Sequence, residues 1–95
     1  MKMIKPIRII YKNTVLSSNG TITNEGENSP SVIIFHNQGT SIAYILGNVA
    51  IVPGQNLVLK NDPGIVIENS FTVTFDTSIS GTTNNLSVIR GYYKE

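Results

Sequence analysis

The sequence predicts an all-β protein: a single-domain antiparallel β-sandwich, jelly-roll or immunoglobulin-like, with about eight short strands. Ile, Val and Thr are abundant and Ala is rare, a composition that favours pleated strands over helices. No segment keeps a helical apolar period over three turns, and turn residues recur at close intervals. The 95 residues suffice for one domain, and the 40% hydrophobic content suffices for a core.

The first half of the chain predicts two hairpins. Asn19-Gly20 is a strong two-residue turn signal and should join a strand at 14–18 to a short strand at 21–23. A polar loop at 24–30 follows. The second hairpin should pair residues 31–37 with residues 40–46, with Gly39 in the left-handed conformation of a bulged turn.

The second half predicts further strands separated by Pro-Gly and polar breaks. Pro53-Gly54 fits a type II turn, which splays strands, so we expect a corner where the chain changes sheets. In the segment from Phe71 to Phe75 apolar and Thr residues alternate, as in a strand with one buried face. The other expected elements are a turn after 47 into a strand at 49–52, strands at 55–60 and 65–68, a turn at 62–64, a loop at 76–85 and a last strand at 86–93.

The predicted hairpin at 31–46 is apolar on both faces. Val32 and Ile34 lie on one side of its first strand, opposite Ile33 and Phe35, and Ile42 and Tyr44 take the equivalent side of the return strand. A two-layer sandwich covers only one of these sides, and leaving three aliphatic side chains in water forfeits roughly 4–9 kcal/mol. The cover is either a loop or the N-terminal arm of the same chain, or another protein.

The charge is small and unevenly placed. The net charge of +1 does not favour nucleic acid or an anionic membrane as a partner. However, Lys2, Lys5, Arg8 and Lys12 all fall in the first twelve residues, so residues 1–6 form a basic arm. This arm would dock on an acidic neighbour, or it is a solvated edge protected by Lys. The start has no apolar core of a secretory signal, and no segment is long and apolar enough to span a membrane.

The sequence offers little chemistry, and we expect no enzyme, no cofactor and no metal. The chain has no Cys, and its one histidine, His36, has no evident acid or nucleophile beside it. The acidic residues Glu25, Glu27, Asp62 and Asp76 lack the spacing of a calcium loop, so loop solvation explains them better. Tyr92-Tyr93 suits stacking on a sugar, or a position at the rim of the core.

Three stretches resemble a known group of proteins. They are Val49-Ala-Ile-Val-Pro-Gly-Gln-Asn-Leu-Val-Leu, Phe71-Thr-Val-Thr-Phe and Asn85-Leu-Ser-Val-Ile-Arg-Gly-Tyr-Tyr-Lys94. Their order of aliphatic strand, Pro-Gly corner, Thr-rich strand and basic-aromatic end resembles small auxiliary capsid and head-fibre-type proteins of tailed bacteriophages, in particular crAss-like phages infecting Bacteroidetes. The resemblance covers about the second half of the chain and is compositional. It implies a multimeric β-sandwich that decorates a capsid or anchors a head fibre, without catalysis.

We therefore expect a virion structural protein that acts by protein–protein adhesion, located in the virion and, during assembly, in the host cytoplasm. Its partners would be copies of itself, with a trimer as one candidate, and a major capsid or other virion protein. The alternative is a small carbohydrate-binding module that uses loops 24–30 and 76–85 with Tyr92 or Tyr93. The expected interface residues are Lys2, Lys5, Arg8, Lys12, Val32, Ile34, Ile42 and Tyr44.

Overall fold

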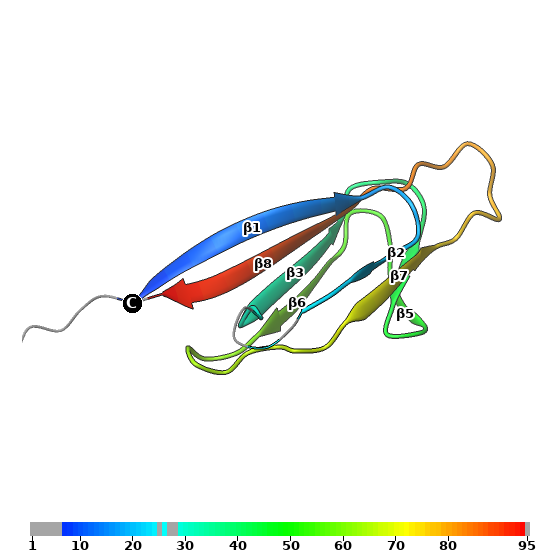
Figure 1. Cartoon of the computed structure of the whole chain (residues 1–95). Coiled ribbons are helices and arrows are strands. Elements are labelled where there is room, and N and C mark those ends of the chain that lie inside the picture. The colour runs from blue at the N-terminus through cyan, green and yellow to red at the C-terminus, as the bar shows by residue number, and fades with distance from the viewer. Residues whose placement is uncertain (1–6, 25, 27–28, 95) are drawn as a thin grey trace, which may run out of the picture.

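The computed structural model describes residues 7–24, 26 and 29–94. Over these residues the chain is all-β, as the sequence predicts, and forms a sandwich of two four-stranded antiparallel sheets (Figure 1). The strands are β1 (Arg8–Leu16), β2 (Gly20–Ile22), β3 (Val32–Asn37), β4 (Ala43–Ile45), β5 (Val49–Ile51), β6 (Asn56–Lys60), β7 (Phe71–Phe75) and β8 (Leu86–Lys94). Sheet A has the strand order β1-β8-β3-β6, and sheet B has the order β2-β7-β4-β5.

The strands pair in a nested way: β1 with β8, β2 with β7, β3 with β6 and β4 with β5. The chain is therefore one long antiparallel ribbon that is folded over so that successive pairs alternate between the sheets. Pairing of β3 with β8 and of β4 with β7 completes each sheet. This is the jelly-roll arrangement, one of the two predicted topologies. It brings the first and last strands of the chain side by side.

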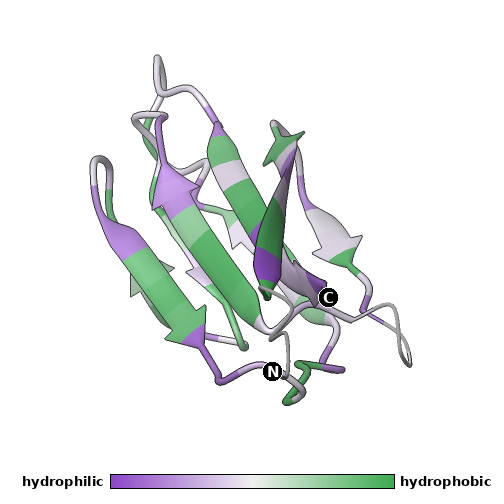
Figure 2. Ribbon diagram, turned by 90° about the vertical axis from the view of Figure 1, so that its left-hand side faces the viewer, coloured by the Kyte–Doolittle hydropathy of each residue, from purple (hydrophilic) through white to green (hydrophobic). Residues whose placement is uncertain are grey.

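The core forms where the inner faces of the two sheets meet. Along β7, Phe71, Val73 and Phe75 are buried while Thr72 and Thr74 are exposed, which confirms the predicted alternation. Phe71 packs edge-on against Phe35 of β3, with ring centroids 5.4 Å apart and an interplanar angle of 70°. Apolar residues run along the strands and polar residues gather at strand ends and connections (Figure 2).

The first predicted hairpin is wrong, because Asn19-Gly20 lies on a crossing between the sheets. β1 runs unbroken to Leu16 in sheet A, and Gly20 begins β2 in sheet B opposite Val73. The Asn19 side-chain oxygen accepts a hydrogen bond from the Phe75 N–H at 2.9 Å. This long-range contact anchors the crossing to β7, and the local preference for a tight hairpin is overridden.

The second predicted hairpin is also wrong, because β3 belongs to sheet A and β4 to sheet B. The connection between them is held by Asn37, which is 0% exposed. Its Nδ2 donates to the Ser41 and Ile51 carbonyls, each at 2.8 Å, and its Oδ1 accepts from the Gly39 N–H at 3.0 Å. Every hydrogen-bonding group of this buried amide is thus used to direct the chain from one layer to the other.

Gly39 does not adopt the predicted left-handed conformation. It is needed because the backbone of residues 83–85 passes against it: its N–H donates to the Asn85 carbonyl at 3.0 Å, and a Cβ at Gly39 would lie 2.7 Å from the Asn85 nitrogen. The predicted strand at 65–68 is absent too. That segment runs unpaired toward β7, fixed by the Ile67 N–H, which donates to the Pro30 carbonyl at 2.7 Å.

The predicted Pro53-Gly54 corner is confirmed. Gly54 has a φ of 82°, and the Gln55 N–H donates to the Val52 carbonyl at 3.0 Å, closing the turn. The turn lies between β5 in sheet B and β6 in sheet A, so the chain changes layer there. The turn at 62–64 is formed in the same way, with Gly64 at a φ of 90°.

Candidate interaction surface

The outer face of sheet A, which is turned away from sheet B, is mostly apolar. The cross-strand register places on it the apolar residues Ile9, Tyr11, Val15, Val32, Ile34, Val58 and Ile89. The same register also places the polar residues Asn13, His36, Asn56, Lys60 and Ser87 on this face. Tyr11, Val15 and Val58 are 54%, 52% and 54% exposed. Exposed side chains of this kind on one sheet face are typical of a protein contact surface.

Val32 lies on this face but is only 3% exposed. It neighbours Gly91 of β8, and the space above Gly91 is filled by side chains of β1. A Cβ at Gly91 would lie 3.0 Å from Tyr11 Cε1, 3.1 Å from Val32 Cβ and 3.2 Å from Ile9 Cδ1. The absent side chain lets Tyr11 and Ile9 lean across the sheet toward Val32. Of the two predicted β3 contact residues, only half-buried Ile34 therefore stays accessible.

The outer face of sheet B is polar by comparison. Its cross-strand pairs place Thr21 opposite Thr72, and Tyr44 opposite Thr74 and Ala50. Ile42 and Tyr44, both half-buried, belong to this side of the sandwich. The four residues predicted as one apolar surface are thus divided between two opposite faces, because β3 and β4 lie in different sheets.

Four basic residues, which we call the basic end, lie on the inner side of the β1–β8 pair. Arg8 stands opposite Lys94 and Lys12 opposite Arg90, with Ile10 and Tyr92 between them. Like charges directly opposite on neighbouring strands destabilise the pair. Lys2 and Lys5, and the arm at 1–6, lie outside the described residues, so docking of the arm stays a prediction.

The described partners of the basic end are neutral. The Lys12 ammonium lies 5.2 Å from the Tyr92 ring centroid, and Arg90 donates to Thr14 Oγ1 at 3.3 Å and to Asn24 Oδ1 at 3.5 Å. Sequence reasoning identified Arg8 and Lys12 but missed Arg90 and Lys94, which lie at the other end of the chain. The sequence did contain a pattern that could have identified them: in β1 and in β8, two basic residues lie four positions apart, with an apolar or aromatic residue midway between them.

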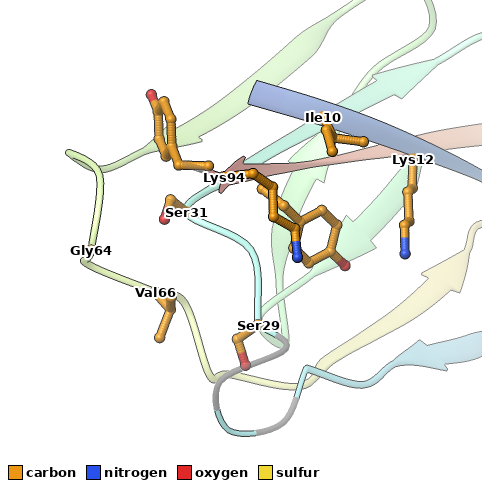
Figure 3. Close-up of a pocket in the computed structure, with 9 residues that line it drawn as sticks. Ile10, Lys12, Ser29, Ser31, Gly64, Val66 and Lys94 are labelled. Carbon is orange, nitrogen blue, oxygen red and sulfur yellow. The ribbon is translucent and has the colours of Figure 1, made fainter. Parts of the chain in front are cut away.

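A pocket of about 490 Å³ opens beside the basic end. Figure 3 shows Ile10 and Lys12 entering it from β1, with Ser29, Ser31 and Val66 on the connections that form its other walls. The rest of the lining comes from Gly64, Tyr92, Tyr93 and Lys94. The pocket therefore combines two ammonium groups with two phenol rings, which suits an anionic group attached to an apolar or ring-shaped body.

The other candidate groups serve local structure. His36 Nδ1 hydrogen-bonds to Asn56 Oδ1 across the β3–β6 pair. The hydroxyl and the backbone N–H of Ser78 bond to the Asp76 carboxylate and hold its pKa below the ordinary value. Glu25 and Glu27 lie outside the described residues. Within the part of the chain that the structure describes, no three His, Cys, Asp or Glu side chains are grouped to hold a metal ion, and no helix could cross a membrane.

Comparison with protein-family models, curated proteins and solved structures finds no match for this chain. The function of the protein must therefore be inferred from the surfaces of the sandwich. Two of them stand out physically: the apolar outer face of sheet A and the basic end with its pocket.

Proposed function

We propose that this protein is a non-enzymatic structural component of a tailed-phage virion, a capsid-decorating or head-fibre protein that acts by adhesion to another virion protein. The observation that supports this most is the contrast between the two outer faces. One sandwich face is aliphatic and aromatic, and the other is rich in Thr. This asymmetry is the pattern expected when one outer face is covered by another protein and the other meets water.

Burial of the exposed apolar side chains would contribute favourable free energy to a contact with another protein. Tyr11, Val15 and Val58 are each about half-exposed. Burying the exposed half of each of these side chains would contribute roughly 1 kcal/mol to binding, before the entropic cost of association is subtracted. This is too little for tight binding by one copy, so attachment would depend on several copies acting together or on added electrostatic attraction.

The basic end supplies such attraction. An acidic partner surface would relieve the repulsion between the opposed pairs Arg8–Lys94 and Lys12–Arg90. Charges at a rim mainly steer encounter and set orientation, while the apolar face supplies the contact area. Adhesion would thus place the outer face of sheet A on the partner, and the basic end, on the inner side of the β1–β8 pair, would meet acidic groups that reach around the Arg8–Lys94 end of that pair.

The role is tested by mass spectrometry and antibody labelling of purified particles of the phage that carries this gene. A structural component is expected at a fixed copy number on the head of every particle. Recovery of particles free of the protein, from cells that express it, would refute the proposal.

Val58→Glu tests the adhesive face. A negative charge beside Ile34 on the apolar face should weaken attachment about tenfold while leaving the fold intact, because Val58 is solvent-exposed. The measurement is co-sedimentation with heads that lack the protein, alongside thermal unfolding. Thr72→Glu is the matched control, since Thr72 is an exposed strand residue on the other outer face. Equal loss with both variants would argue against a face-specific contact.

The double variant Arg8→Glu, Lys94→Glu tests the basic end. These residues face each other, so reversing both charges keeps the repulsion within the protein and changes only its attraction to a partner. Attachment should fall by about tenfold at low ionic strength, and the difference from the native protein should shrink as salt is added. The double variant Thr21→Glu, Thr72→Glu, an opposed pair on the outer face of sheet B, should have little effect. A salt-independent loss would show that charge is not the cause.

A carbohydrate-binding module is the second candidate, and the pocket that contains Tyr92 and Tyr93 favours it. Ser29 brings the 24–30 loop to this pocket. The 76–85 loop lies at the other end of the nine-residue strand β8 and contributes nothing to it, so that part of the prediction is wrong. A glycan array distinguishes the candidates: specific binding that Tyr92→Ala abolishes, by a protein absent from particles, would establish the module.

A further inference from the structure

The outer edge of β1 is the least protected part of the sandwich. Among the described residues, four strands end a sheet: β1 has nine residues, β6 has five, and β2 and β5 have three each. β1 lies at the rim of sheet A with β8 as its described neighbour on one side (Figure 1). Its register with β8 is continuous from Arg8–Lys94 to Leu16–Leu86, so no bulge interrupts it.

Natural proteins usually shield such an edge. The common devices are a short strand, a proline, a bulge or inward-pointing charges, because free N–H and C=O groups along a straight edge pair readily with another strand. β1 has no proline and no bulge, and it is the longest of the edges. Inward-pointing charge is the one device of this kind that β1 carries: Arg8 at its start, and Lys12, whose ammonium lies 5.2 Å from the Tyr92 ring centroid.

We propose that two copies of this chain pair edge to edge through β1, antiparallel, about a two-fold axis at Asn13. In this register Asn13 faces its own copy, Lys12 faces Thr14 of the second copy, Tyr11 faces Val15, and Ile10 faces Leu16. Apolar residues meet apolar residues on both sides of the sheet, and no like charges are opposed. The result is one continuous eight-stranded sheet formed by two copies of sheet A.

Neighbouring registers fit less well. Side chains directly opposite in an antiparallel pair point to the same side, so the apolar outer faces stay together only when the paired numbers are both odd or both even. Centring the pair on Lys12 sets Lys12 against its own copy. Centring it on Thr14 sets Lys12 against Leu16 and Val15 against Asn13. The register centred on Asn13 alone among these three matches polar with polar and apolar with apolar.

The pairing also changes the size of the apolar surface. With strands of nine, nine, six and five residues, one outer face of sheet A covers on the order of 450 Å². A stable protein contact buries about 800 Å² on each partner. Two faces joined in one sheet reach this size, and Tyr11 and Val15 move from the rim to its centre. The proposal concerns the purified protein alone and does not depend on the virion role.

Cysteine cross-linking tests the register directly, because the chain contains no Cys. Opposed antiparallel residues have Cα atoms about 4.5–5.5 Å apart, which suits a disulfide. Asn13→Cys should form a covalent dimer on mild oxidation. Tyr11→Cys alone should not, because the two copies of residue 11 are offset by four residues, about 13 Å. A mixture of Tyr11→Cys and Val15→Cys should form the heterodimer. Asn56→Cys, on the opposite edge strand, is the control and should stay monomeric.

Sedimentation equilibrium provides the second measurement. The native protein should show a reversible twofold increase in mass, and the double variant Tyr11→Lys, Val15→Lys, which opposes lysines across the axis, should be monomeric with an unchanged circular dichroism spectrum. A native protein that stays monomeric at all concentrations, a dimer that survives in the double variant, or cross-linking through Asn56→Cys but not Asn13→Cys would each overturn the proposal. None of these results depends on whether the protein is found in particles.

Discussion

Asn37→Ala is expected to lower the free energy of unfolding by about 3–5 kcal/mol. Asn37 is fully buried, and its amide serves the carbonyls of Ser41 and Ile51 and the N–H of Gly39. Of these, the Gly39 N–H keeps its bond to the Asn85 carbonyl, while the two carbonyls lose the partner that Asn37 provides. A buried polar group without a partner costs about 1–3 kcal/mol, and the volume left by the side chain adds a cavity term.

Urea denaturation of the native protein and the variant measures this loss. Asn56→Ala is the control, because Asn56 is exposed and its substitution should change stability by no more than about 0.5 kcal/mol. Asn37→Asp should be at least as harmful as Asn37→Ala, because it directs a second oxygen at the two carbonyls that Asn37 Nδ2 now serves. A loss below about 1 kcal/mol in Asn37→Ala would mean that water or backbone movement replaces the amide.

Gly39→Ala is expected to destabilise the protein by about 3 kcal/mol, the upper part of the usual range for overpacking. The new methyl group would overlap the Thr83 carbonyl oxygen and lie 2.7 Å from the Asn85 nitrogen. Both are backbone atoms of residues whose carbonyls accept hydrogen bonds from the 38–41 segment: the Thr40 and Ser41 N–H groups donate to the Thr83 carbonyl at 2.9 and 3.0 Å, and the Gly39 N–H donates to the Asn85 carbonyl. Because rotation of a side chain cannot relieve the overlap, the crossing must move away from the 83–85 segment.

Gly20→Ala is the matched control for this variant. A Cβ at Gly20 meets nothing closer than Leu16 Cδ2 at 3.8 Å, which is ordinary contact. Gly20 also has no positive φ, so Ala there should be neutral or slightly stabilising. Similar thermal midpoints for the two variants would contradict the close approach at Gly39.

Both predictions concern the connection between β3 and β4. That connection separates two apolar strands into different layers, and so leaves Ile34 on the outer face of sheet A and Tyr44 on that of sheet B. Under the proposed adhesive role, a variant that loosens the crossing should also weaken attachment, because the outer face of sheet A depends on β3 staying between β6 and β8.

Several features follow from the sequence by itself. The alternation of Phe71, Val73 and Phe75 is a local period that allows one buried face, and Pro53-Gly54 restricts the backbone to a turn that splays strands. The composition, rich in Ile, Val and Thr and poor in Ala, disfavours helices. These are local properties of the chain, and they were sufficient for the all-β class, the sandwich and the corner between its sheets.

Only the tertiary structure determines which strands pair with one another. Asn19-Gly20 has the chemistry of a hairpin turn, yet the hydrogen bond to Phe75, far away in sequence, places it on a crossing. Gly39 is required because the backbone of residues 83–85 passes against it, and no local sequence pattern predicts this long-range contact. The basic end likewise exists because the jelly roll joins the first strand to the last, setting Arg8 beside Lys94. Periodicity and turn chemistry act over a few residues, whereas pairing depends on contacts between distant segments, so the sequence determined the elements and the folded chain determined which of them meet.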